Sequence, residues 1–78
     1  MRSVHTDAYR VVTSELKRSR EQAGLTQQEL ARRLKRPQSF VAKYELGERR
    51  LDLAEFVAIA QALGVSPIRL FSKIVKQI

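Results

Sequence analysis

The residues best suited to chemistry in this sequence follow a proline near its middle. On helical spacing, Gln38, Ser39 and Lys43 share one face with Ala42, at offsets of one, four and five from the first. These side chains can hydrogen-bond to the edges of bases: glutamine to adenine, lysine to guanine, and serine to either. Because a B-DNA major groove admits one helix, this face is suited to reading bases; the alternative is a polar face that is only solvated.

Positive charge is concentrated just before this face. Four cations lie within five residues, at a break between two helical patterns: Arg32, Arg33, Lys35 and Arg36. Residues 17–50 contain ten cationic and four acidic residues, so they carry most of the net charge of +7. This distribution favours a polyanion as partner, although a basic surface that only keeps the protein in solution is the alternative.

Other kinds of chemistry find little support in the sequence. There is no cysteine, and the lone histidine, His5, lies in a polar start. No nucleophile–base pair, metal-ligand cluster or phosphate-binding loop is visible, so we expect no catalytic residue, no metal site and no cofactor. No apolar run approaches the roughly 20 residues of a membrane span. We therefore expect a cytoplasmic protein without a membrane partner.

Cap residues and apolar spacing divide the chain into five expected helices and no strand, an all-α fold. The expected ranges are 7–23, 27–34, 38–46, 53–63 and 67–78, after an N-terminal arm at 1–6. Thr26 and Glu29 have the spacing of a capping box, and Gly24, Gly47 and Gly64 are expected helix ends. The expected core positions are Tyr9, Val12, Leu16, Ala23, Leu30, Ala31, Leu34, Val41, Tyr44, Leu53, Phe56, Val57, Ile59, Ala60 and Leu63.

The second and third expected helices carry a resemblance to a known family. The run GLTQQELARRLKRPQSFVAKYELGERR, followed by LGVSP, resembles the Cro/C1-type, or XRE-family, helix-turn-helix of phage repressors and bacterial regulators. The resemblance extends over about residues 16–71. It implies a five-helix, lambda-repressor-like domain over residues 7–78 that binds double-stranded DNA. Helix 38–46 would read bases through Gln38, Ser39 and Lys43.

The resemblance also assigns supporting roles around that helix. It implies that Gln27 contacts the DNA backbone and braces Gln38. We expect phosphate contacts from the flanking loops, and Phe40 is expected either to pack on the sugar-phosphate backbone or to fill core. The further expected phosphate contacts are Arg36, Arg49 and Arg50. The resemblance also implies a structural ion pair between Arg20 and Glu45.

Three residues depart from the pattern of the family. Lys35 stands where glycine is usual, which costs free energy if its φ is positive. Ser19 stands where a leucine is usual, which thins the core. Leu46 replaces a usual asparagine or serine, so a polar contact near the loop is expected to be absent.

The last expected helix has more apolar residues than one small domain needs. Leu70 and Phe71 are expected to close the core. Ile74, Val75 and Ile78 are then predicted to form a two-fold homodimer interface, with two reading helices about one DNA turn apart. The alternatives are a frayed apolar tail on a monomer and a segment that binds a membrane surface.

These observations predict a sequence-specific DNA-binding regulator that is not an enzyme, most simply a repressor that acts by occupying a promoter. An antitoxin or a restriction-modification controller is the nearest alternative of the same fold. A protein-interaction module that does not read DNA, with an unknown protein partner, is the alternative from another class. A general RNA or nucleoid binder would show steep salt dependence without sequence preference.

Overall fold

Five α-helices make up residues 7–78, the part of the chain that the computed structural model describes. They are α1 (Asp7–Gln22), α2 (Gln27–Leu34), α3 (Gln38–Glu45), α4 (Leu53–Leu63) and α5 (Pro67–Gln77). No strand occurs within these residues. The expected arm at 1–6, with His5, lies outside the described residues.

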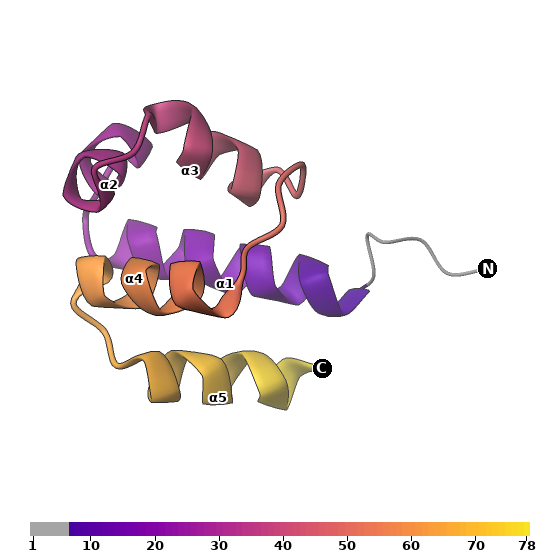
Figure 1. Cartoon of the computed structure of the whole chain (residues 1–78). Coiled ribbons are helices and arrows are strands. Elements are labelled where there is room, and N and C mark those ends of the chain that lie inside the picture. The colour runs from indigo at the N-terminus through magenta and orange to yellow at the C-terminus, as the bar shows by residue number, and fades with distance from the viewer. Residues whose placement is uncertain (1–6) are drawn as a thin grey trace.

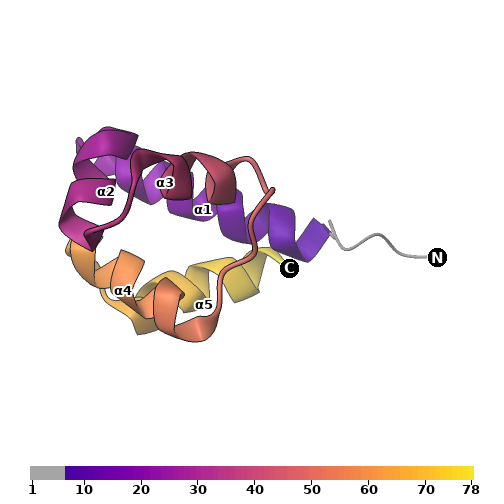
Figure 2. The same cartoon turned by 45° about the horizontal axis from the view of Figure 1, so that its top comes forward.

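The helices form two groups around the long α1. Helix α1 packs against α3 and α5, α2 packs against α3 and α4, and α4 packs against α5. Figure 2 shows α2 and α3 on one side of the molecule and α4 and α5 on the other. The pair α2–α3 is thereby held on the outside of the bundle, with its supports beneath it (Figure 1).

Local cap residues set most of the helix ends. The Thr26 hydroxyl accepts from the Glu29 backbone N–H at 3.1 Å, and the Glu29 carboxylate accepts from the Thr26 N–H at 2.8 Å. Asp52 and Glu55 make the same reciprocal pair at the start of α4. These boxes satisfy backbone donors that a helix start leaves free. The expected helix boundaries agree with the structure to within about a residue, and α3 ends at Glu45 rather than at Leu46, which caps it.

The core lies where the five helices meet. Its buried residues are Leu16, Leu30, Ala31, Phe40, Val41, Tyr44, Ile59, Ala60, Leu63, Leu70 and Ile74. Three expected core positions are wrong, since Ala23, Leu53 and Val57 are exposed. Ala23 follows the last residue of α1. Leu53 is the first residue of α4, ahead of its buried residues Ile59, Ala60 and Leu63. Val57 is rotated by about 160° around α4 from Ile59.

Two apolar residues of α5 have the opposite burial from the one predicted. Ile74, expected at a dimer interface, is 2% exposed and belongs to the core. Phe71, expected in the core, is 55% exposed. Leu70 and Ile74 are one turn apart and therefore face the same way, whereas Phe71 is rotated by about 100° from Leu70. The exposed flank of α5 also includes Val75 and Ile78.

Within residues 7–78, no single helix is both long and apolar enough to cross a membrane. Helices α4 and α5 reach that composition only as a pair, and they meet at a bend of 113°.

Candidate nucleic-acid interface

The crossing of α2 and α3 rests on small and fully buried side chains. Ala31 and Val41 are both buried, and a small residue at position 31 allows the helices to approach closely. The turn between the helices passes through Lys35, whose φ of 57° and ψ of 42° are left-handed. Its backbone N–H donates to the Arg32 carbonyl, and the Arg36 N–H donates to that of Ala31. A lysine therefore occupies the conformation that glycine adopts without strain, so the condition stated for a cost at this position is met.

The three residues predicted to read bases lie together on the exposed side of α3. Gln38, Ser39 and Lys43 are all exposed, while Phe40, Val41 and Tyr44 on the opposite side are buried. This helix lies at the outer edge of the bundle (Figure 2). The amphipathic division is what a helix needs if one face is anchored and the other meets a partner.

A chain of hydrogen bonds ties Gln38 to the interior. The Gln38 Nε2 donates to Gln27 Oε1 at 2.7 Å, and the Gln27 Nε2 donates to Glu45 Oε1 at 2.9 Å. A primary amide has two N–H donors and a carbonyl oxygen. Gln38 therefore keeps one N–H and its oxygen for a further partner, the two groups that a bidentate contact with adenine requires.

The inner end of this chain is an ion pair with little exposure. Arg20 Nε donates to Glu45 Oε2 at 2.7 Å, and Arg20 Nη2 donates to Oε1 at 3.0 Å. The two side chains are 10% and 4% exposed. The hydrogen bond with Glu45 raises the pKa of Arg20 despite its burial. Arg20 also donates to the Leu25 carbonyl at 2.8 Å, so the predicted pair joins α1, the start of α2 and the end of α3.

Two of the predicted phosphate contacts surround Phe40. The guanidinium carbons of Arg36 and Arg49 lie 4.3 and 4.9 Å from the centre of the Phe40 ring. Phe40 is 7% exposed and packs edge-on against Tyr44, so it fills core, one of the two expected possibilities. Its covered ring offers no free surface to a sugar-phosphate backbone. The two arginines, not the ring, form the outer surface here.

Glu55, which was not among the predicted site residues, holds these two arginines. Its carboxylate lies 3.1 Å from Arg36 Nη2 and 2.8 Å from Arg49 Nη2. The hydrogen bond from the Asp52 backbone lowers the pKa of Glu55, and the bond from Arg49 adds to this effect. The spacing Asp52-x-x-Glu55 is the same capping-box signal as at the start of α2. That signal could have revealed the cap, but not the arginines.

Arg50 and the loop after α3 are attached to α1. The Arg50 guanidinium lies 4.4 Å from the Tyr9 ring centre, and the Tyr9 hydroxyl donates to the Arg49 carbonyl at 2.7 Å. Burial raises the pKa of Tyr9. The three arginines predicted to contact phosphates thus all lie in loops that are attached to the bundle. Within residues 7–78, no group of three or more His, Asp or Glu side chains could hold a metal ion.

Comparison with known proteins agrees with this geometry. Residues 16–70 match the helix-turn-helix family HTH_3. The chain belongs to this XRE-type helix-turn-helix family. It is therefore a DNA-binding transcription regulator with the five-helix Cro/C1-type fold that the sequence predicted. The family is one of regulators rather than of enzymes. No curated protein matches the sequence.

Solved structures support the same family. An XRE-family-like protein from Pseudomonas syringae pv. tomato is 44% identical with a TM-score of 0.88, over 95% of this chain and 90% of that one. A mutant of the restriction-modification controller protein C.Esp1396I is 25% identical with a TM-score of 0.84, over 92% and 91% of the two chains. A hypothetical transcription factor from Neisseria is 25% identical with a TM-score of 0.77, over 92% and 86%.

Proposed function

We propose that this helix-turn-helix protein regulates transcription by reading a specific double-stranded DNA sequence with α3. The observation that carries the proposal is the fixed orientation of Gln38 on the exposed face of that helix, held through Gln27. An adenine would meet the free oxygen and N–H of Gln38, and Lys43 and Ser39 would contact neighbouring base edges. A preoriented side chain loses little conformational entropy on binding, which favours specific contacts over general attraction.

Phosphate contacts would set the position of the domain on the DNA. Gln27 begins α2, where backbone N–H groups and the helix dipole favour a phosphate. Arg36, Arg49 and Arg50 lie in the loops that flank α3. Since Arg36 and Arg49 share Glu55, a phosphate would compete with that carboxylate for them. Arg50 makes no contact with Glu55 and would reach a phosphate more freely.

We propose that the protein acts as a two-fold homodimer through the exposed flank of α5. Phe71, Val75 and Ile78 are each at least half exposed. Ile68, also on α5, and Leu53 of α4 add to the exposed apolar residues. A dimer would place two α3 helices in successive major grooves of a near-palindromic site. Bound over a promoter in the cytoplasm, it would act as a repressor by excluding polymerase.

A second candidate function is control of a restriction-modification operon. The similarity to the controller protein C.Esp1396I over nearly the full length of both chains favours it. Both functions use the same DNA-reading surface. A genome search with the selected DNA site distinguishes them, because a controller site would lie beside restriction and methylation genes.

The test is selection of bound DNA from a random duplex pool at near-physiological salt, followed by sequencing. We expect an enriched palindrome with half-sites about one helical turn apart. Gln38→Ala and Lys43→Ala should each relax one or two positions of this site, whereas Lys76→Ala, far along α5, should leave the sequence preference unchanged. A pool without enrichment, bound only at low salt, would contradict base reading and would favour a protein-interaction module or a general nucleic-acid binder.

A further inference from the structure

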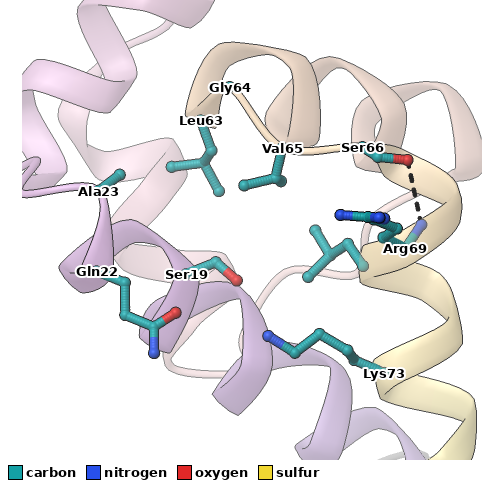
Figure 3. Close-up of a pocket in the computed structure, with 10 residues that line it drawn as sticks. Ser19, Gln22, Ala23, Leu63, Gly64, Val65, Ser66, Arg69 and Lys73 are labelled. Atoms are coloured by element: carbon teal, nitrogen blue, oxygen red, sulfur yellow. Dashed lines mark hydrogen bonds between the residues drawn. The ribbon is translucent and has the colours of Figure 1, made fainter.

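A pocket lies on the side of the bundle where the end of α1 faces the start of α5. Its volume is about 590 Å³, within the range of roughly 300–1,000 Å³ that is usual for small-molecule sites. It opens between α1, the connection from α4 to α5, and α5 itself (Figure 3). Residues that define it are Ser19, Leu63, Val65, Ser66, Arg69 and Lys73.

The walls of the pocket differ in chemistry. Figure 3 shows the side chains of Leu63 and Val65 directed into it from the end of α4 and the following connection. The Ser19 hydroxyl and the Lys73 amine reach towards it from α1 and α5, and the Arg69 guanidinium closes the remaining side. An apolar wall thus faces hydrogen-bond donors, the combination typical of sites for small amphipathic molecules.

The charge in this pocket is positive. None of its lining residues is acidic. Among the described residues, the Arg69 guanidinium has no hydrogen bond or ion pair; only its backbone N–H is bound, by Ser66. Lys73 lies 3.5 Å from the buried Glu15, but Glu15 also lies 2.6 Å from Arg18. The Glu15 carboxylate is therefore shared by Arg18 and Lys73. No acidic side chain within residues 7–78 neutralises the charge of Arg69.

The residue at position 19 explains why this space is open. Ser19 is almost fully buried, so its Cβ points into the structure rather than to solvent. Leucine is the usual residue at this position in the helix-turn-helix pattern that the sequence resembles. A leucine side chain would extend by three carbon atoms where serine has one oxygen, and it would occupy the mouth of the pocket beside Leu63. The departure at Ser19 therefore creates room next to two cations.

We propose that this pocket binds a small organic anion. Its carboxylate or phosphate head would be held by Arg69 and Lys73, with Ser19 as a further donor, and its apolar body would lie against Leu63 and Val65. Arginine is suited to this role because its planar guanidinium bonds an oxyanion through two parallel N–H groups. The proposal does not depend on which DNA sequence α3 reads, or on whether it reads one.

The pocket and the proposed dimer surface lie on different flanks of α5. Arg69 and Lys73 are one turn apart and face α1, on the same side as Gln77, which donates to Glu15 at 2.9 Å. Phe71 and Val75 are rotated by about 200° from Arg69 and Lys73 respectively. A ligand in the pocket would therefore leave the exposed apolar flank uncovered, so the two kinds of binding can be told apart residue by residue.

The test is a titration of the ¹⁵N-labelled full chain, followed by amide chemical shifts. The probes are 3-phenylpropionate and phenyl phosphate, with 3-phenylpropionamide as the uncharged control and inorganic phosphate as the control without an apolar body. We expect saturable shifts around Ser19, Val65 and Arg69 with at least one of the two anions. The uncharged amide should bind about tenfold more weakly or worse, because it cannot form a charge-assisted hydrogen bond. Inorganic phosphate should also bind about tenfold more weakly, because it has no apolar body to lie against Leu63 and Val65.

Variants separate the pocket from general charge. The double variant Arg69→Gln with Lys73→Gln should weaken binding about tenfold or more, whereas Lys76→Gln, a cation of the same helix outside the pocket, should not. Ser19→Leu should abolish binding while raising the melting temperature, because it fills the space with apolar volume; this rise shows that the variant is folded. Equal binding of the uncharged amide, binding that persists in Ser19→Leu, shifts centred on Phe71 and Val75, or no saturable shift with either anion would overturn the proposal.

Discussion

Gln38 donates a hydrogen bond to Gln27 at 2.7 Å, and this contact joins the exposed face of α3 to the first residue of α2. Gln27 is bound in turn by Glu45, which the nearly buried Arg20 holds through two hydrogen bonds. The side chain proposed to read a base is thus oriented by a chain of polar contacts that ends inside the bundle. Each link of this chain can be removed separately.

Removing the outer links should separate affinity from specificity. Gln38→Ala should reduce discrimination at one base pair of the selected site by about 1–3 kcal/mol, the usual value of a bidentate contact. Gln27→Ala should weaken binding to all related sites, because it removes the side-chain N–H that Glu45 leaves available to a phosphate, as well as the support for Gln38. Fluorescence anisotropy with the selected duplex and its single-base variants measures both effects.

Gln28→Ala is the matched control for these variants, since Gln28 is an exposed neighbour on the same helix. It should change neither quantity. If Gln38→Ala instead lowered the affinity for every duplex by the same factor, Gln38 would be a backbone contact and would not read a base.

The ion pair between Arg20 and Glu45 should contribute to the free energy of unfolding. Glu45→Ala leaves Arg20 with little exposure and without its charged partner, and we expect the free energy of unfolding to fall by about 3–5 kcal/mol. The double variant Arg20→Met with Glu45→Ala should lose less than the sum of the two single variants, because neither charge is then left unpaired. Urea denaturation followed by circular dichroism gives these values, and additive losses would mean that the pair is not coupled.

The helix ends could be predicted from the sequence because their causes are local. The side chains of Thr26 and Glu29 each accept a hydrogen bond from the other's backbone N–H, within four residues of sequence. Gly64 ends α4 with a φ of 76°. The same holds for the exposed face of α3, whose helical period separates polar residues from Val41 and Tyr44. Such features need no knowledge of how helices are packed together.

Features that depend on packing could not be predicted in the same way. The apolar stripe of α5 is wide enough to be buried in more than one rotation, and only its contacts with α1 and α4 decide that Ile74 is inside and Phe71 outside. The attachment of Arg36 and Arg49 to Glu55 likewise joins residues 19 and 6 positions apart through the fold. Sequence spacing carries no signal for contacts of this kind.

The left-handed turn at Lys35 offers a stabilising substitution. Residues with a Cβ lose about 1–2 kcal/mol in this conformation, and Lys35 has a φ of 57°. Lys35→Gly should therefore raise the free energy of unfolding by about 1 kcal/mol. Lys35→Ala removes the same charge but keeps the Cβ, so it should bring no comparable gain. Thermal and urea denaturation of both variants decide this, and equal effects would assign the change to charge instead of backbone strain.

Glu55 should make stability depend on acid. Its pKa is lowered in the folded protein by the Asp52 backbone and by Arg49, so the unfolded chain takes up the proton at a higher pH. The stabilisation is then fully present above the unfolded pKa of about 4.3, and it is lost as the pH falls through the lower folded pKa. Melting temperatures measured between pH 7 and pH 2 should show that Glu55→Gln is less stable than the native protein at neutral pH and that the difference shrinks in acid. A difference that stays constant would exclude this carboxylate as the cause.

The two flanks of α5 should respond to substitution in different ways. Val75 and Ile78 are 50% and 68% exposed, so Val75→Asp with Ile78→Asp should leave the fold intact but place charge in the proposed dimer interface. Light scattering at micromolar concentration should then give the mass of a monomer, and affinity for the palindromic site should fall because one half-site is bound at a time.

Ile74→Ala should instead lower the free energy of unfolding by about 2–5 kcal/mol, because Ile74 is buried in the core. The molecules of this variant that remain folded should still form the dimer. Lys76→Asp, which changes the charge of the same helix away from the apolar flank, controls for the added acid. If the native protein were a monomer at these concentrations, the exposed flank would not be a dimer surface, and each α3 would read its half-site alone.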